Sequence, residues 1–353
     1  MIQLIKKWLS ERVDLSELEH FIEKKEVPIH KHSFWYYMGG LALFFFVIQV
    51  ATGILLLLYY KPSSEHAYES IKFIMNDVHF GWLVRSMHSW GANLFVGILF
   101  IHMISTFFLK AYRKPRELTW VTGVILFCLA LGMGFSGYLL PWDELALFAT
   151  KVGTDIAGSV PFIGDFMLKL LRGGEDISGA TLTRFFGFHV AILPAVMTFV
   201  LVIHVLLVQI QGMSIPIGYE NKIKRKVKFF GEFIWHDGMI WMIGLAVWVF
   251  ISTYSPWGLG PKADPFAPAP AGIKPEWYFM FMFETLKLIP GHVLFLEGEV
   301  LGIMGFMVFF LLLFIVPFID KKASLNQKSK VFTVVGVIVV AYMFMMTVIG
   351  YLK

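Results

Sequence analysis

Seven long stretches without Asp, Glu, Lys or Arg divide this chain of 353 residues. They begin near residues 34, 86, 118, 185, 238, 300 and 331, and each runs for roughly 20 residues or more. An α-helix of that length crosses the apolar core of a bilayer while satisfying its own backbone hydrogen bonds. Only 16% of the residues are charged, against about 25% in soluble domains. The pattern therefore predicts an all-α, polytopic membrane protein with seven transmembrane helices, and it excludes a water-soluble fold.

The positive charges predict the orientation of the chain in the membrane. Nineteen of the 30 Lys and Arg residues lie in the first 33 residues and in the loops after the second, fourth and sixth stretches. Such residues gather on the cytoplasmic side, so we expect the N-terminus on the negative (n) side and the C-terminus on the positive (p) side. Loop charge also explains the net charge of +5, so we expect no nucleic-acid partner.

The order of the stretches predicts three parts. Residues 1–33 form an amphipathic n-side arm without the apolar core of a removed signal peptide. Residues 34–220 hold four helices, and residues 221–353 hold three, after a basic segment that we interpret as a topology signal. The two long p-side loops, about 138–184 and 255–299, are expected to carry function. Within them, residues 161–171 and 277–290 are expected to form short amphipathic helices at the membrane surface.

Four of the eleven histidines lie well inside the apolar stretches. His88 and His102 lie on the second helix, and His189 and His204 lie on the fourth. The spacing on the second helix is close to four turns, so both side chains project from one face, about 21 Å apart. The two helices run in the same direction, which places the pairs His88–His189 and His102–His204 at two levels. Two opposed imidazoles at one level suit a six-coordinate haem iron, whereas a lone membrane histidine is more often a packing residue.

Glycines repeat with the same spacing on the first and third helices. The pairs are Gly39 with Gly53 and Gly123 with Gly137. A haem wedged into a four-helix core needs surface without side chains where the ring crosses these helices. The alternative is that these glycines only allow close packing of membrane helices.

Cations near the helix ends are candidates for binding haem propionates. Arg85 and Arg184 lie toward the p side, near His88 and His189. Arg113, Lys114 and Arg116 follow the second helix and suit the n-side haem. A positive-inside signal is an equally good explanation of these last three.

These residues resemble a known family, cytochrome b of the cytochrome bc complexes and of the plastid-type bf complexes. The motifs that carry the resemblance are WLVRSMHSWGANL, FIHM, KPRELTWVTG, GYLLPWD, LLRGG, LTRFFGFH and ADPFAPAPAGIKPEWYF. It covers about residues 20 to 350. The front half is more similar to the plastid type, in which the two halves are separate chains. Here they are fused, with seven helices instead of the eight of mitochondrial-type chains.

The resemblance implies a quinol oxidation site on the p side. Oxidation of a quinol releases protons, so a base must accept one from its hydroxyl group, and the resemblance makes Glu276 the candidate. Asp143, near the opposite wall, either adds a proton path or caps the next helix. The residues implied for this site are Pro275, Glu276, Trp277 and Tyr278, with Tyr138, Pro141 and Trp142 on the opposite wall.

A second quinone site is implied on the n side, beside the haem of His102 and His204. Gln209 and Asp237 match quinone-binding positions of some relatives, with helix-end solvation and N-capping as the alternatives. Ser214 and His236 are weaker candidates.

The resemblance also bears on a third haem. Plastid-type relatives carry a cysteine for a covalent haem at the position of Tyr37, which is instead a candidate for contacting quinone or for packing. The single cysteine, Cys128, lies in the middle of the third helix and is expected to be a buried apolar residue. We therefore expect no covalent haem on this chain.

Together these observations predict the dihaem cytochrome b subunit of a quinol:cytochrome c-type oxidoreductase that couples electron transfer to proton translocation. Expected cofactors are two b haems and quinone. Because the chain has no CxxCH motif or iron–sulfur ligand cluster, a Rieske iron–sulfur protein and a c-type cytochrome are expected as partner subunits. The resemblance also implies a homodimer, membrane lipid as a partner, and an energy-transducing membrane, such as a bacterial inner membrane, as the location. The alternatives are a dihaem anchor of a quinone-linked dehydrogenase, without bifurcation, and a transporter.

Overall fold

A computed structural model describes residues 1–12, 14, 16–223 and 225–353. Seven helical segments among these residues are long and apolar enough to cross a membrane, which confirms the expected all-α, seven-span fold. They are η1–α3 (Ser33–Tyr36 and Tyr37–Leu57), α5 (Gly81–Phe108), α6 (Glu117–Tyr138), α9–η2–α10 (Gly179–Gly187, Phe188–Ile192 and Leu193–Gln211), η4–α11 (Phe229–Phe233 and Ile234–Tyr254), α13 (Gly298–Ile319) with α14 (Lys321–Ser324), and α15 (Lys330–Leu352). Helix α5 begins at Gly81, before the charge-free stretch that starts near residue 86. It therefore includes Arg85, which is buried.

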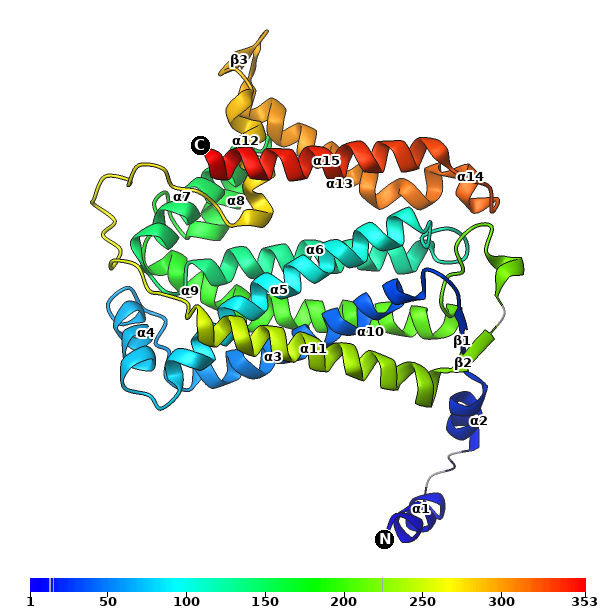
Figure 1. The fold of residues 1–353 in the computed structure, drawn as a ribbon. Coiled ribbons are helices and arrows are strands. Elements are labelled where there is room, and N and C mark those ends of the chain that lie inside the picture. The colour runs from blue at the N-terminus through cyan, green and yellow to red at the C-terminus, as the bar shows by residue number, and fades with distance from the viewer. Residues whose placement is uncertain (13, 15, 224) are drawn as a thin grey trace.

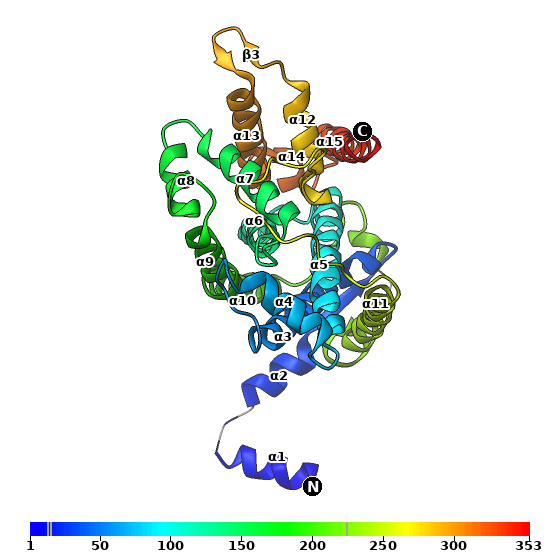
Figure 2. The same ribbon diagram turned by 90° about the vertical axis from the view of Figure 1, so that its left-hand side faces the viewer.

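A four-helix bundle of α3, α5, α6 and α10 forms the centre of the molecule (Figures 1 and 2). Helix α3 packs along α5, and α6 packs along α10. Their facing surfaces meet in one apolar cluster that includes Phe45, Phe95, Leu126 and Met197. Helix α11 follows the bundle in sequence but lies against α3 and α5, where its Trp248 joins the same cluster.

The last helices form a separate layer, visible at the top of Figure 1. Helix α12 (Trp277–Leu288) packs against α15 and α13, and α13 packs against α6 of the bundle. The link to the bundle is a second apolar cluster, in which Tyr278 of α12 meets Val96, Phe127 and Leu131. The segment Pro275–Tyr278, for which the resemblance implies quinol oxidation, is thereby packed against the bundle.

Short elements gather at the two ends of the bundle. The arm end, at the right in Figure 1, holds β1 (Glu26–Ile29), paired antiparallel with β2 (Arg225–Lys228), and also η3 (Glu220–Lys222) and α14. Helices α1 (Ile2–Ser10) and α2 (Ser16–Lys24) precede β1. The far end holds α4 (Ala67–Asn76), α7 (Glu144–Gly158), α8 (Gly164–Arg172), and the hairpin of β3 (His292–Val293) and β4 (Leu296–Glu297). Helices α8 and α12 confirm the expected short helices in the two long loops.

Candidate functional site

Each of the four histidines inside the bundle faces one of the four spaced glycines on a neighbouring helix. The histidines belong to α5 and to the η2–α10 segment, and the glycines belong to α3 and α6. A β-carbon built on Gly53 would lie 3.3 Å from Cε1 of His88, on Gly137 2.6 Å from Cε1 of His189, on Gly39 3.2 Å from Cε1 of His102, and on Gly123 3.2 Å from Cε1 of His204. The glycines therefore make room for the imidazole rings themselves.

The histidines form two pairs at two levels. The ring centroids of His88 and His189 are 6.2 Å apart, with an angle of 82° between the ring planes. That separation leaves room for one metal ion with a bond of about 2 Å to each ring nitrogen. His102 and His204 line one cavity of about 320 Å³ at the arm end of the bundle.

Hydroxyl groups next to the glycines fix two of the imidazole rings. Thr52 donates a hydrogen bond to the carbonyl of Ile48 at 2.8 Å, and its oxygen lies 2.9 Å from Nδ1 of His88. Because the hydroxyl proton is already used, Nδ1–H of His88 is the donor to Thr52. Thr122 holds Nδ1 of His204 in the same way, also at 2.9 Å. This tautomer leaves Nε2 as the free metal-binding atom.

The remaining two histidines differ from each other. Nδ1 of His189 lies 3.1 Å from the carbonyl of Met133 and 3.3 Å from the hydroxyl of Ser136, the residue before Gly137. Nδ1 of His102 is buried and has no hydrogen-bond partner among the described residues. Met38 precedes the facing Gly39, so this position has no hydroxyl group. One imidazole of the arm-end pair is therefore not held by a hydrogen bond.

A π-helical turn explains why the histidine spacing on the fourth span is one residue longer than on the second. His189 lies in η2, a π-helix that joins α9 to α10. Pro194 follows at the start of α10, and proline cannot donate the hydrogen bond of an α-helix and clashes with the preceding turn. A π turn accommodates one extra residue in a helix. The turn thus brings His189 and His204 into register with His88 and His102.

The donor set fits haem. A haem supplies four of the six iron ligands, so two imidazoles with free Nε2 atoms complete the coordination. Among the residues described in the structure, no three His, Cys, Asp or Glu side chains gather into a metal-binding group. The histidine pairs, the hydroxyl partners and the glycine clearance all match a group that needs only two protein ligands.

Residues Pro275–Tyr278, here called the PEWY segment, lie at the far end. Glu276 is the residue before the first turn of α12. Trp277 donates an indole hydrogen bond to Asn93 of α5 at 2.8 Å. The hydroxyl of Tyr278 lies against Gly134 of α6, where any β-carbon would collide with it. The segment is therefore anchored to both α5 and α6.

Glu276 is partly buried and lies near two tyrosines. Burial raises the pKa of the Glu276 carboxyl above its ordinary value. Tyr138, at the end of α6, and Tyr278 are close enough to interact with this carboxylate electrostatically. Pro275, which precedes Glu276, is partly buried. The structure thus places Tyr138 near the PEWY segment, an arrangement that the family resemblance implied.

Asp143 caps a helix. Its Oδ1 accepts a hydrogen bond from the backbone N–H of Ala146 at 2.9 Å at the start of α7. Its Oδ2 accepts one from the N–H of Gly260 at 3.3 Å. Both oxygens therefore fasten α7 to the loop that leads to the PEWY segment. The neighbouring Trp142 is buried and adopts a left-handed backbone conformation, and Pro141 precedes it.

The arginines named from the sequence bind mainly to the backbone. Arg85 is buried and donates to the carbonyl of Trp257 at 2.7 Å. Arg184 is exposed at the far end, where it packs over Gly173. Arg113 is buried and ties three arm-end segments together. Its partners are Asn326, the hydroxyl of Ser214, and the carbonyls of Lys110 and Ile215.

The arm-end cavity gathers several of the remaining candidates. Gln209 and Asp237 both line it with His102 and His204, and Oε1 of Gln209 is buried without a partner among the described residues. The carboxyl of Asp237 lies against Gly40, where a β-carbon would collide with it.

The other candidates at this end lie in different surroundings. Ser214 lines the cavity, but His236 is exposed and bonds to the carbonyl of Glu232. Tyr36 and Trp241 also line the cavity and were missed. Each lies about one turn from a residue of the pattern, Tyr36 from Gly39 and Trp241 from Asp237, which is the signal that identifies them. Tyr37 instead stacks on Phe233, with ring centroids 4.8 Å apart.

Cys128 packs beside a cluster formed by Tyr112, Trp120 and Val124. The thiol is partly buried among these apolar side chains. Its surroundings are those of an apolar packing residue.

The fold and the site together define a class: an all-α integral membrane protein that holds two pairs of partly buried histidines between its helices. The chain matches the family described as cytochrome b/b6/petB over residues 23–212 and the family described as cytochrome b(C-terminal)/b6/petD over residues 262–353. The chain belongs to the cytochrome b family, in which the front and back domains are here joined in one polypeptide. Membership of this family implies haem b as a cofactor.

Known proteins are similar to this chain over its whole length or over its front part. The cytochrome bc complex cytochrome b subunit of Chlorobaculum thiosulfatiphilum is 50% identical over 96% of this chain and 79% of the relative. The menaquinol:cytochrome c reductase cytochrome b subunit of Bacillus subtilis is 46% identical over 62% of this chain and all of the relative. A solved structure of a hyperthermophilic respiratory Complex III matches with a TM-score of 0.86 and 32% identity, covering 98% of this chain and 91% of its own.

Proposed function

We propose that this chain is the dihaem cytochrome b subunit of a quinol:cytochrome c oxidoreductase. The observation that carries the proposal is the set of four histidine–glycine contacts at two levels of the bundle. His88 and His189 would hold one b haem, and His102 and His204 the other. When bound, the two haems supply one-electron transfer across the membrane.

The residues around Glu276 support quinol oxidation at the far end. A base for this reaction must accept a proton from the quinol hydroxyl and later release it. Burial raises the pKa of the Glu276 carboxyl. The carboxylate therefore binds a proton more strongly than an exposed glutamate does, as a general base requires. Trp277 and Tyr278, anchored on α5 and α6, hold the start of α12 in position.

The arm-end cavity supports a quinone-reducing site. Gln209 and Asp237 present polar groups to the cavity that also receives His102 and His204. A quinone carbonyl accepts hydrogen bonds, and its reduction takes up protons. We assign Gln209 to holding the quinone head and the Asp237 carboxyl to supplying a proton at its oxygen.

Bifurcation and the partners follow from this division of sites. One electron from quinol passes to a Rieske iron–sulfur protein and then to a c-type cytochrome, and the second passes through the bundle to quinone. The relatives named as cytochrome bc and menaquinol:cytochrome c reductase subunits favour these partners and make menaquinol the first substrate to test. The complex is proposed to be a homodimer that translocates protons, with the arm end on the n side.

The proposed parts are residues 1–33 as the arm, 34–220 as the dihaem domain and 221–353 as the PEWY-bearing domain. Although α11 belongs to the third part in sequence, its contacts with α3 and α5 join the two parts. Bound lipid and two non-covalent haems complete the proposed complex.

The decisive experiment follows the b haems in the purified complex during quinol oxidation. The complex is mixed with menaquinol, and the oxidised c-type acceptor is then added while quinone reduction at the arm end is inhibited. Bifurcation predicts that adding this oxidant makes the b haems more reduced, because each quinol must send its second electron to them. A dihaem anchor without bifurcation would show b haems that only become more oxidised, which would refute the proposal.

A further inference from the structure

The arm-end cavity of about 320 Å³ has one proposed proton donor, although the reduction of a quinone takes up two protons, one at each carbonyl oxygen. Apart from the proposed haem ligands, the ionisable side chains among the described residues that line it are Tyr36, Tyr112, Arg116 and Asp237. Asp237 is the proposed source of one proton. The arginine keeps its proton in proteins, and the hydroxyl of Tyr112 already donates to Asp320 at 2.8 Å. Tyr36 is therefore the remaining candidate for the second proton.

Tyr36 belongs to a chain of hydrogen bonds that begins at His30. The backbone N–H of His32 donates to Nδ1 of His30 at 3.1 Å, so the proton of the neutral imidazole is on Nε2. This Nε2 atom lies 2.6 Å from the hydroxyl oxygen of Tyr36, which donates its own proton to the carbonyl of Ser214 at 2.8 Å. Because the hydroxyl proton is used in this way, the oxygen of Tyr36 accepts from His30. The two protons therefore point from His30 through Tyr36 toward Ser214, which lines the cavity.

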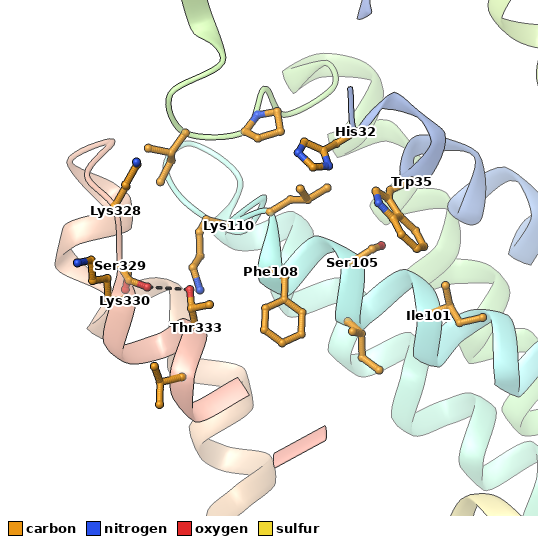
Figure 3. A pocket seen from close by; sticks show the side chains of 15 residues that line it. His32, Trp35, Ile101, Ser105, Phe108, Lys110, Lys328, Ser329, Lys330 and Thr333 are labelled. Carbon is orange, nitrogen blue, oxygen red and sulfur yellow. Dashed lines mark hydrogen bonds between the residues drawn. The ribbon is translucent and has the colours of Figure 1, made fainter. Parts of the chain in front are cut away.

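His30 lies on the outer side of this chain. It is partly buried and lies between β1 and η1, before the first membrane-spanning segment. The neighbouring His32 lines a second and larger cavity of about 820 Å³ at the same end. Figure 3 shows His32 and Trp35 on one side of this larger cavity, across from Lys328. Trp35 lines both cavities, so the segment that carries His30 and Tyr36 separates the inner cavity from a space that water can reach.

The surrounding charges favour proton transfer in the inward direction. Burial, with a smaller contribution from His32, lowers the pKa of His30 below its ordinary value. The imidazole is therefore neutral near pH 7, and it gives up a proton readily once it has gained one. Arg113 and Arg116 act on Tyr36 electrostatically. Their positive charges stabilise the tyrosine oxygen while it lacks its proton.

We propose that Tyr36 gives the second proton to quinone in the arm-end cavity and that His30 replaces this proton from the solvent. The inference rests on the proposed function, which supplies the quinone and the two electrons that reach it through the bundle. The O–H bond of Tyr36 breaks as a new O–H bond forms on the quinone oxygen. The Nε2–H bond of His30 then breaks to restore the hydroxyl, while Nδ1 of His30 takes up a proton from water. The imidazole returns to its first tautomer by proton exchange with water, and neither residue is oxidised or reduced.

The test measures how fast quinone oxidises the b haems of the intact purified complex through the arm end. The complex is reduced, the far-end site is inhibited, and 2,3-dimethyl-1,4-naphthoquinone is added while b-haem absorbance is followed by stopped flow. Tyr36→Phe keeps the ring but removes the hydroxyl, and His30→Gln keeps a hydrogen-bond donor but cannot relay a proton. We expect each variant to be slower by about tenfold or more at saturating quinone. The haem spectra and the quinone concentration that gives half the maximal rate should not change.

A matched control and a chemical rescue separate proton transfer from a structural role. His32→Gln replaces a histidine two residues from His30, whose Nε2 lies 3.3 Å from the hydroxyl of Tyr219, and it should keep the wild-type rate. Imidazole added to the buffer should restore the rate of His30→Gln, because a dissolved imidazole carries the proton to Tyr36. The same addition should not restore Tyr36→Phe, which has no hydroxyl to receive the proton.

The possible outcomes distinguish this inference from the proposed function. Wild-type rates in Tyr36→Phe or His30→Gln overturn the relay, and so does an equal loss in His32→Gln or a loss in His30→Gln that imidazole does not restore. If His30→Gln fails to assemble, Tyr36→Phe decides: a lower maximal rate supports the relay, and a change only in the half-maximal quinone concentration overturns it. If quinone does not oxidise the b haems of the wild-type complex, the proposed quinone-reducing site is refuted together with the relay.

Discussion

Gly137→Ala is the sharpest test of how the bundle makes room for its histidines. The added β-carbon would lie 2.6 Å from Cε1, 3.0 Å from Nδ1 and 3.2 Å from Nε2 of His189. The first distance is about 1 Å shorter than a normal contact of about 3.5–4.0 Å between carbon atoms. The ring must move, and its hydrogen bond from Nδ1 to the carbonyl of Met133 must lengthen with it.

The free energies have opposite signs for the helix and for the haem site. Alanine is favoured over glycine in a helix by up to about 1 kcal/mol, so α6 itself is not weakened. Overpacking at the ring costs about 1–3 kcal/mol, which corresponds to a roughly 5- to 150-fold weaker affinity of the far-end haem. Gly53→Ala is the matched control, because its β-carbon would lie 3.3 Å from Cε1 of His88 and needs only a small adjustment.

The assay measures the haem content per chain of the purified protein. A redox titration followed by visible absorbance then counts the b components. Gly137→Ala should lose or shift one of two b components, whereas Gly53→Ala should keep both with small shifts. Two unchanged components in Gly137→Ala would refute the clearance argument. Equal damage from both substitutions would show that glycine flexibility, and not contact with the ring, decides the outcome.

Four further predictions concern the haem ligands and the proposed quinol base. His102→Ala should leave one b component in the redox titration and block electron transfer across the membrane; two retained components would contradict the ligand assignment. Met38→Thr places a hydroxyl before Gly39, as at the other three positions, and should lower the midpoint potential of the arm-end haem, because a hydrogen bond at Nδ1 makes the His102 ligand more basic; an unchanged potential would count against this. Burial raises the pKa of Glu276, so wild-type turnover should increase with pH as the carboxyl loses its proton, whereas Glu276→Gln should be slower, with intact haem spectra and without this pH dependence. A denaturing gel stained for haem peroxidase activity should show no band at the mass of this chain, since haems held by two imidazoles dissociate on denaturation; a persistent band would reveal a covalent haem.

The seven spans were predictable because charge is excluded from hydrocarbon over a fixed length. The same rule placed the start of the second span too late, because it treated Arg85 as the limit of the helix. In the structure the guanidinium is buried and binds the carbonyl of Trp257, which supplies the compensation that a charge at this depth needs. Compensation by a residue distant in sequence is not visible in a local pattern.

The levels and faces of the histidines and glycines in the bundle were predictable from helical spacing, but the contacts between them were not. The sequence indicated glycine clearance for a haem, and the structure adds that each glycine lies directly against an imidazole. The pattern does not explain why His189 and His204 are one residue further apart in the sequence than His88 and His102. The π turn before Pro194 is the physical explanation, and it depends on a backbone rearrangement that spacing alone does not specify.

The histidine–glycine contacts also couple the proposed haem sites to the packing of the bundle. Each contact joins two different helices, α3 with α5 or α6 with α10, and each histidine pair joins α5 to the fourth span. A group bound between the imidazoles therefore links all four helices at its level. Because only the packed bundle presents both ligands, binding stabilises that packing by mass action. The free Nε2 atoms would be costly as unpaired polar groups in an apolar core, and a group bound to both Nε2 atoms of a pair would compensate that cost and hold the helices at this level in register.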